Sequence, residues 1–280
     1  MNQLRPLNPF NNVVASGIAN VDLNPLLGTT LECINLSLGG TFTKAMITLI
    51  QLKANGKVIF ETTGTNLDLS ENYKAYVAAD ATKLSINFME QKAKTPNAFQ
   101  AGALDLSPDS GITNLRLEAT IAGATAPTLT GIAEVSPAID IPSEREIRFL
   151  MHRRHRNTQT IGAAGTFSLQ VPHLEPSGGG SVFKRILVFS AFCTALKALR
   201  EGITEFDTLR GEHEWIQKKA LRTPQTNLHV FDPVLDGIMA GRVWDTRPAN
   251  RVRSAQLYAT FSAGETITIE TEELLPLSMY

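Results

Sequence analysis

The chain has 280 residues and a net charge of −1, so we expect no bulk attraction to nucleic acid or to an acidic membrane. Sequence-specific nucleic-acid binding is not expected either. Its length suits one large or two medium domains. It has no apolar run long enough to span a membrane, and Met1–Phe10 lacks the apolar core of a secretory signal. The charge is uneven, because residues 1–142 are net acidic and residues 143–280 are net basic.

The first half of the chain is predicted to be mainly short β-strands. Alternating or apolar patterns place strands at residues 19–23, 30–38, 45–53, 57–62, 83–90, 112–122 and 129–135. Asn55-Gly56 predicts a tight hairpin, since both residues tolerate positive φ. Thr65 is expected to cap a helix reaching about Tyr76. Residues 1–15 are expected to form an arm.

The second half repeats this order. Strands are expected at residues 165–171, 182–192, 194–199, 204–208, 227–231, 252–261 and 266–272. Glu201-Gly202 predicts a tight turn, and residues 209–221 predict a helix with acids early and bases late. Val182–Phe192 is apolar enough to be covered on both faces.

Two short matches indicate an internal repeat. Gly56–Thr62 matches Gly202–Thr208 at an offset of 146 residues, and each copy precedes a predicted helix. Leu117–Thr120 matches Leu257–Thr260 at an offset of 140 residues. The order and nearly equal offsets predict one domain type built twice, with Phe60 and Phe206 in equivalent places.

The junction is predicted at Ser136–Pro142, where two prolines keep the backbone extended. We therefore expect domains at residues 1–142 and 143–280. Roughly eight short strands and one helix in each half predict an all-β protein of two tandem jelly rolls, each of eight strands. An immunoglobulin-like sandwich fits less well, because each unit carries a helix and has about 140 residues.

Several motifs carry a resemblance to a known family. They are Leu7-Asn8, Asn11–Ala15, Leu27–Thr29, Cys33–Leu36, the Asn55-Gly56 hairpin, Ser136-Pro137 and Met151–Arg154. With them, the chain resembles the double jelly-roll major capsid proteins of tailless icosahedral bacteriophages with an internal membrane, the corticovirus-like coat proteins. It departs from that family in longer loops near residues 92–111 and 237–250.

The resemblance implies a structural role in the virion. It implies a homotrimer whose six jelly rolls form a pseudo-hexagonal tile of an icosahedral shell, made in the host cytoplasm. The expected partners are neighbouring capsomers, penton and minor capsid proteins, and the internal viral membrane. Structural calcium is compatible with the family, and Asp105, Asp109 and Asp140 could meet a cation, but the sequence does not place a metal site.

The most basic stretch follows the junction. Its members are Arg145, Arg148, His152, Arg153, Arg154, His155 and Arg156. One interpretation is a solvated strand edge whose charges discourage sheet pairing. The functional alternative is contact with acidic lipid headgroups or phosphates inside the shell, and contact with neighbouring subunits is a third.

No catalytic or cofactor signature is found. His152 and His155 could ligate a metal on a helix, but their cationic neighbours argue against it. Glu212–Glu214 lacks the second histidine of a zinc protease, and Gly178–Gly180 lacks the lysine of a phosphate loop. We therefore predict that the chain is not an enzyme. The two cysteines, Cys33 and Cys193, are expected to be buried thiols.

The rival hypothesis is a tandem β-sandwich that binds carbohydrate, or a cupin-like protein. A lectin would gather aromatic side chains on loops, whereas aromatic residues make up 7% of this chain and are dispersed. A cupin would need paired histidines one residue apart with a glutamate. Trp215 and Trp244 are instead expected to anchor a core or an interface.

Overall fold

The structure is a computed structural model, and it describes residues 3–76, 80–138, 150–239 and 242–276. The chain forms two compact units. The first takes Met1–Asn72, Tyr76–Arg154 and Leu275–Tyr280, and the second takes Tyr73–Ala75 and His155–Leu274. The predicted boundary between residues 142 and 143 lies outside the described residues.

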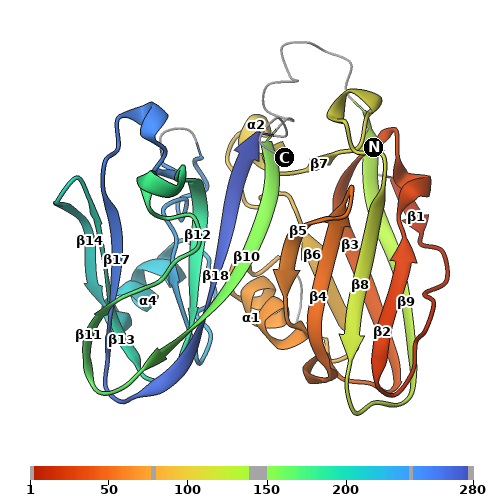
Figure 1. Ribbon diagram of the computed structural model, residues 1–280, viewed down its shortest axis with the longest axis horizontal. Helices are drawn as coiled ribbons and strands as arrows, with labels where there is room; N and C mark the ends of the chain where they lie inside the picture. The colour runs from red at the N-terminus through yellow and green to blue at the C-terminus, as the bar shows by residue number, and fades with distance from the viewer. Residues whose placement is uncertain (1–2, 77–79, 139–149, 240–241, 277–280) are drawn as a thin grey trace. The chain divides into compact units, whose positions relative to one another are not determined.

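The first unit consists of two facing antiparallel sheets (Figure 1). One has the order β1 (Gln3–Pro6), β9 (Thr125–Pro137), β3 (Thr29–Thr41), β6 (Lys83–Asn87), with β7 (Leu104–Asp105) also on β3. The other has the order β5 (Lys57–Thr62), β4 (Ile47–Ala54), β8 (Leu115–Ile121), β2 (Gly17–Asp22). The start of β10 (Leu150–Ile161) lies parallel to β5. This strand order is that of a jelly roll.

Local turn chemistry shapes the first unit. Asn55 and Gly56 both have positive φ, 47° and 81°, so the predicted hairpin joins β4 to β5. The helix α1 (Gly64–Lys74) follows β5. Its cap is Thr63 rather than Thr65, because the Thr63 hydroxyl accepts the Asn66 N–H at 3.1 Å. A short helix, α2 (Pro96–Gln100), replaces part of the predicted loop.

The second unit repeats this topology. One sheet runs β10, β18 (Glu265–Pro276), β12 (Val182–Phe189), β15 (Leu228–Phe231), with β16 (Trp244–Asp245) beside β12. The other runs β11 (Gly165–Ser168), β17 (Ala255–Phe261), β13 (Cys193–Arg200), β14 (Ile203–Leu209). The helix α4 (Arg210–Lys219) follows β14. Single 3-10 turns, η1 (Asn24–Leu26), η2 (Lys44–Met46), η3 (Pro108–Ser110), η4 (Pro176–Gly178) and η5 (Pro248–Asn250), connect the strands.

The internal repeat has a structural counterpart. Phe60 lies in β5 opposite Leu52, and Phe206 lies in β14 opposite Ala198. Each of these strands stands at one end of the four-strand order given above for its sheet. Each pairs with the strand that precedes it in the chain and is followed by a helix. The second match lies in β8 and β17, which hold the same place in their sheets. The predicted double jelly roll is therefore confirmed.

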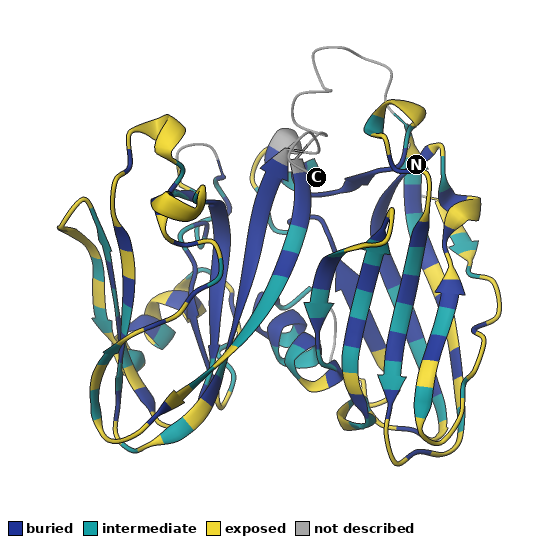
Figure 2. Cartoon of the chain, in the orientation of Figure 1, coloured by how far each residue is buried: buried dark blue, intermediate teal, exposed yellow. Residues whose placement is uncertain are grey.

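Burial follows the pleat of the strands. Along β8, buried and half-buried residues alternate strictly, as Figure 2 shows, because successive side chains point to opposite faces. Along β12 every residue from Val182 to Val188 is buried, as the apolar run predicted. The expected N-terminal arm instead contains β1, which pairs with β9. Among the described residues, no helix has the length and apolar character needed to cross a membrane.

Candidate functional site

The predicted basic stretch lies largely on β10. Arg145 and Arg148 fall outside the described residues. The other five lie on a strand, so they alternate between its two faces. His152 and Arg154 are buried, at 1% and 0% exposure, whereas Arg153 is half-buried.

Arg154 and His152 are core residues of the first unit. The Arg154 Nη1 donates to the Ser70 Oγ at 2.9 Å, and its guanidinium carbon lies 5.6 Å from the centre of the Phe60 ring. The His152 ring lies 6.1 Å from Phe60 and 6.2 Å from Phe88, between ring centres. Neither side chain can contact a lipid headgroup. The hypothesis of contact with acidic lipid headgroups or phosphates therefore applies only to the other members of the stretch.

The remaining described members are Arg153, His155 and Arg156, all half-buried. The idea that His152 and His155 ligate one metal on a helix is wrong. Residues three apart on a strand point to opposite faces, and the two rings have different neighbours. His152 packs on phenylalanines of the first unit, whereas His155 belongs to the second unit.

His155 meets His173 and Glu273. The two histidine rings lie edge to face, with their centres 4.5 Å apart. His173 Nδ1 lies 3.3 Å from Glu273 Oε1 and 3.2 Å from Oε2. One ligand atom from each of the three residues lies within 4.8 Å of the other two. Within the described parts of the chain, this group has the composition and spacing of a cation site.

Glu273 is the buried member of this group. Burial by itself would raise the pKa of its carboxyl, but the hydrogen bond with His173 and the nearby His155 hold that pKa below its usual value. Ser181 Oγ donates to Oε2 at 2.7 Å, and Thr271 Oγ1 donates to Oε1. The carboxylate is therefore held in place from two sides.

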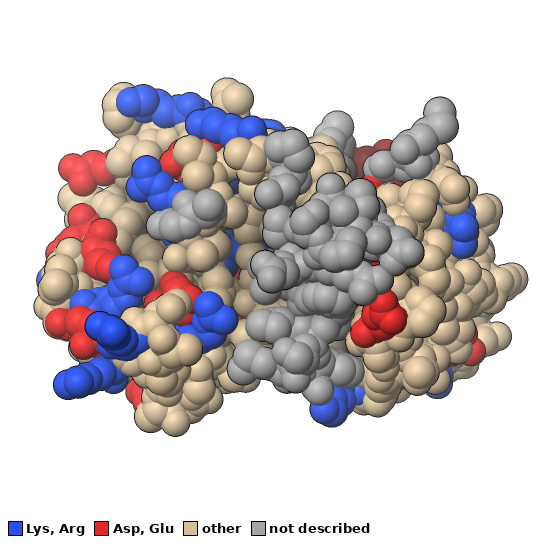
Figure 3. Space-filling model, turned by 90° about the horizontal axis from the view of Figure 1, so that it is seen from above, with Lys and Arg blue, Asp and Glu red and all other residues tan. Residues whose placement is uncertain are grey.

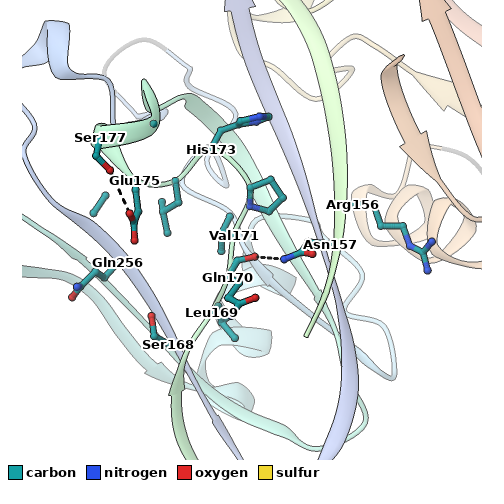
Figure 4. Close-up of a pocket in the computed structure, with 14 residues that line it drawn as sticks. Arg156, Asn157, Ser168, Leu169, Gln170, Val171, His173, Glu175, Ser177 and Gln256 are labelled. Carbon is teal, nitrogen blue, oxygen red and sulfur yellow. Dashed lines mark hydrogen bonds between the residues drawn. The ribbon is translucent and has the colours of Figure 1, made fainter. Parts of the chain in front are cut away.

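A polar hollow of about 640 Å³ lies in the second unit next to this group. Figure 4 shows Ser168, Gln170, Glu175 and Gln256 around it, while the His173 side chain points toward β18. Glu175 Oε2 accepts a long hydrogen bond, 3.4 Å, from Ser177 Oγ. At this distance the Ser177 hydroxyl lies beyond the roughly 2.6–3.2 Å that is typical of an activated nucleophile and its base.

A buried ionic cluster lies elsewhere in the second unit. Arg185 Nε lies 2.9 Å from Asp232 Oδ2, and Arg185 Nη1 lies 3.1 Å from Glu272 Oε2. Lys74 Nζ lies 3.1 Å from Glu272 Oε1, and the Tyr73 hydroxyl donates to Asp232 at 3.1 Å. All five side chains are buried. No sequence pattern considered above predicted this cluster, although the charges inside the apolar β12 run could have signalled it.

Exposed apolar side chains gather on and beside α4. Leu209 is 59% exposed, Trp215 62%, Ile216 44% and Leu221 73%. The Lys219 ammonium lies 4.7 Å from the centre of the Trp215 ring. Trp244, in contrast, is buried in the core and donates to Glu205 at 2.7 Å. Of the two tryptophans, only Trp215 is free to anchor an interface.

Charge on the visible surface is mixed. On the face shown in Figure 3, lysine and arginine atoms lie among aspartate and glutamate atoms over the second unit. Ion pairs such as Arg200–Glu205 and Arg247–Asp245 also bring charges of opposite sign together in this unit. Among the described residues drawn there, no broad patch of one sign is visible, as the net charge near zero leads one to expect.

Two of the three aspartates proposed for a cation lie in the described structure. Asp105 is buried and accepts the N–H and hydroxyl of Ser107 at 2.9 and 3.0 Å. Asp109 lies in η3, and Asp140 lies outside the described residues. Structural calcium therefore stays a prediction without an assigned site.

Comparison with known families decides the identity. The family described as "Viral coat protein P2 N-terminal domain" matches residues 4–136, and "Viral coat protein P2 C-terminal domain" matches residues 151–277. The chain belongs to the viral coat protein P2 family. No curated protein sequence matches it. As a viral coat protein it is a structural component of the capsid, and the carbohydrate-binding and cupin-like alternatives are not favoured.

Solved structures share the fold of this coat protein. The major capsid protein P2 from bacteriophage PM2 superposes with a TM-score of 0.83 at 19% identity, covering 98% of this chain and 97% of that one. The STIV major capsid protein gives 0.69 at 11% identity, covering 99% and 97%. The PBCV-1 capsid gives 0.61 at 10% identity, covering 98% and 93%. At these identities the likeness concerns the fold.

Proposed function

We propose that this coat protein is the major capsid protein of an icosahedral virus and assembles as a homotrimer. Two topologically matched jelly rolls in each chain support this proposal, because three chains would supply six similar units around one three-fold axis. The resulting pseudo-hexagonal tile would contact neighbouring capsomers, penton proteins and minor capsid proteins. The junction between the rolls would lie near residues 142 and 143, between the two matched ranges.

The apolar set beside α4 is our candidate for part of the trimer contact. Permanent interfaces bury on the order of 2,000 Å² or more and are apolar at their centres. Leu209, Trp215, Ile216 and Leu221 offer apolar surface of this kind, and exposed tryptophan is typical of interface anchors. The apolar run Val182–Phe192 suits this role poorly, because β12 is already covered within its own unit.

Light scattering of the purified protein tests this assembly. The expected mass is three times the 30.5 kDa of one chain. Changing Trp215 and Ile216 together to Asp should dissociate the trimer, because it places charges in an apolar contact. Ile18→Asp, at a 49% exposed apolar position of the first unit, is the control and should keep the trimer. A single-chain mass for the unmodified protein would refute the trimer.

We further propose that the half-buried part of the basic stretch lies near an internal viral membrane. Arg153 and Arg156 are its described candidates, and Arg145 and Arg148 belong to the same proposal. Each cation near an anionic surface contributes about 1 kcal/mol. Reversing Arg153 and Arg156 to Glu should weaken co-sedimentation with vesicles that contain phosphatidylserine. Arg251→Glu with Arg253→Glu, both exposed, is the matched control. Equal binding by both variants would remove the membrane role and leave the trimer standing.

We propose no catalysis for this protein and synthesis in the host cytoplasm. Its membership of a coat protein family supports the first point. Cys33 and Cys193 are both buried thiols that form no disulfide, and burial raises the pKa of Cys193 to about 12. A thiol that stays protonated is unreactive, which is compatible with folding in a reducing compartment.

A further inference from the structure

The group formed by His155, His173 and Glu273 has a geometry that the coat function leaves unexplained. These residues come from β10, from the loop after β11 and from β18, so the fold brings together three separate segments. We propose that they form a binding site for Zn²⁺ or a similar divalent transition metal.

The distances are compatible with two ligands of one metal as well as with a long hydrogen bond. A charge-assisted N–H···O bond is about 2.7–2.9 Å long, whereas His173 Nδ1 lies 3.2 and 3.3 Å from the two Glu273 oxygens. Zinc bonds to nitrogen and oxygen of about 2.0–2.1 Å, arranged tetrahedrally, place neighbouring ligand atoms about 3.3–3.4 Å apart. The His173–Glu273 pair is thus already spaced as two corners of such a site.

Hydrogen bonds from neighbouring residues orient the Glu273 carboxylate, as is usual for a carboxylate that binds a metal. Metal-bound carboxylates are oriented by further hydrogen bonds, and Ser181 and Thr271 each donate one hydroxyl to Glu273. A carboxylate has about four lone-pair positions, so these two bonds leave room for a metal. Glu273 is buried at one side of the group, while the His173 side chain is 42% exposed.

The ligand types select the class of metal. Two imidazoles and one carboxylate suit zinc and its transition-metal neighbours, whereas calcium prefers six to eight oxygen ligands. Three protein ligands leave a fourth position for water, and the exposed side of His173 gives water access to it. The proposed site is therefore distinct from any calcium site suggested by the aspartates.

A metal at this site would link β10 and β18, the first and last strands of the second jelly roll, to the loop between β11 and β12. This inference goes beyond the proposed function, since it concerns the stability of one chain and not its assembly. Because a metal that binds only the folded protein raises its stability by mass action, zinc should raise the melting temperature of the second roll.

The test uses full-length protein stripped with a chelator and titrated with ZnCl₂ by calorimetry. We expect a single zinc ion per chain and a higher melting temperature. Co²⁺ in place of zinc should give the visible absorption of a tetrahedral site. CaCl₂ in excess should not displace the zinc.

Three variants decide where the metal sits. His173→Ala and His155→Ala should each lower the zinc affinity by at least about tenfold, with unchanged far-UV circular dichroism. His213→Gln, which removes a histidine elsewhere in the same unit, should keep the affinity. Zinc binding that survives both alanine changes, or that is lost in the His213 variant, would overturn the proposal. So would the absence of binding in the unmodified protein.

Discussion

Acid should destabilise the second jelly roll through a buried histidine pair. His213 Nδ1 lies 3.3 Å from His229 Nε2, and the two side chains are in residues only 2% and 1% exposed. Burial lowers the pKa of His213 to about 4 and that of His229 to about 3. The carboxylates of Asp232 and Glu214 raise the pKa of His213 and so oppose the effect of burial. At His229, the neighbouring His213 and Arg210 lower the pKa further.

The sign and size of the change in stability with pH follow from proton linkage. In the unfolded chain both histidines titrate near pH 6.5, so between pH 6.5 and about 4 the unfolded state binds protons that the folded state refuses. Stability is therefore fully present above pH 6.5 and falls as the pH drops. At pH 5 the loss is roughly 2 kcal/mol for each histidine. Carboxyl groups contribute little in this window, since they titrate near pH 4.

Urea unfolding at pH 7, 6 and 5 measures this loss, with protein concentration held constant because assembly also affects apparent stability. The matched comparison is the double variant His213→Gln with His229→Gln. It removes both titrating groups, so its stability should change much less between pH 7 and pH 5. A wild-type stability that stays flat over this range would contradict the reasoning. The same holds if the double variant keeps the full wild-type slope.

Three further predictions concern stability. Phe60→Ala should cost about 3–5 kcal/mol in urea unfolding, whereas Phe206→Ala, at a half-buried position, should cost about 1–2 kcal/mol; equal costs would contradict the burial difference. Asp232→Asn should lower stability by about 3–5 kcal/mol, since it leaves buried cations undercompensated, and an unchanged melting temperature would count against the ionic cluster. Gly180→Ala should cost more than Gly56→Ala, because both have positive φ but only at Gly180 would a Cβ collide with backbone; equal melting temperatures would speak against that collision.

The sequence predicted the architecture well where the determinants are local. Asn55-Gly56 and Glu201-Gly202 adopt the positive φ values that their turns require. The matched segments at Phe60 and Phe206 indicated the repeat, because equivalent strands keep similar side-chain patterns. The helix after each hairpin followed from polarity and capping residues. Only the cap position was missed, by two residues, since Thr63 and Thr65 offer the same hydroxyl.

The sequence could not predict which basic residues are buried. Arg154 lies among other cations in sequence, which favours a solvated face, yet it donates to Ser70, 84 residues away. His173 and Glu273 are likewise 100 residues apart, so no spacing signals their meeting. These features depend on strand pairing and packing between distant segments, which periodicity does not encode.

The end of α1, with Tyr73 and Lys74, belongs to the second unit, and this has a consequence during synthesis. Lys74 pairs with a glutamate 198 residues later in the chain, and Tyr73 with an aspartate 159 residues later. At about 5–20 residues per second, a ribosome delivers these partners roughly 10–40 s after the end of α1 has emerged. The first jelly roll can therefore form its sheets early. The end of its helix remains in water until nearly the whole chain has been made, so the ionic cluster closes among the last steps of folding.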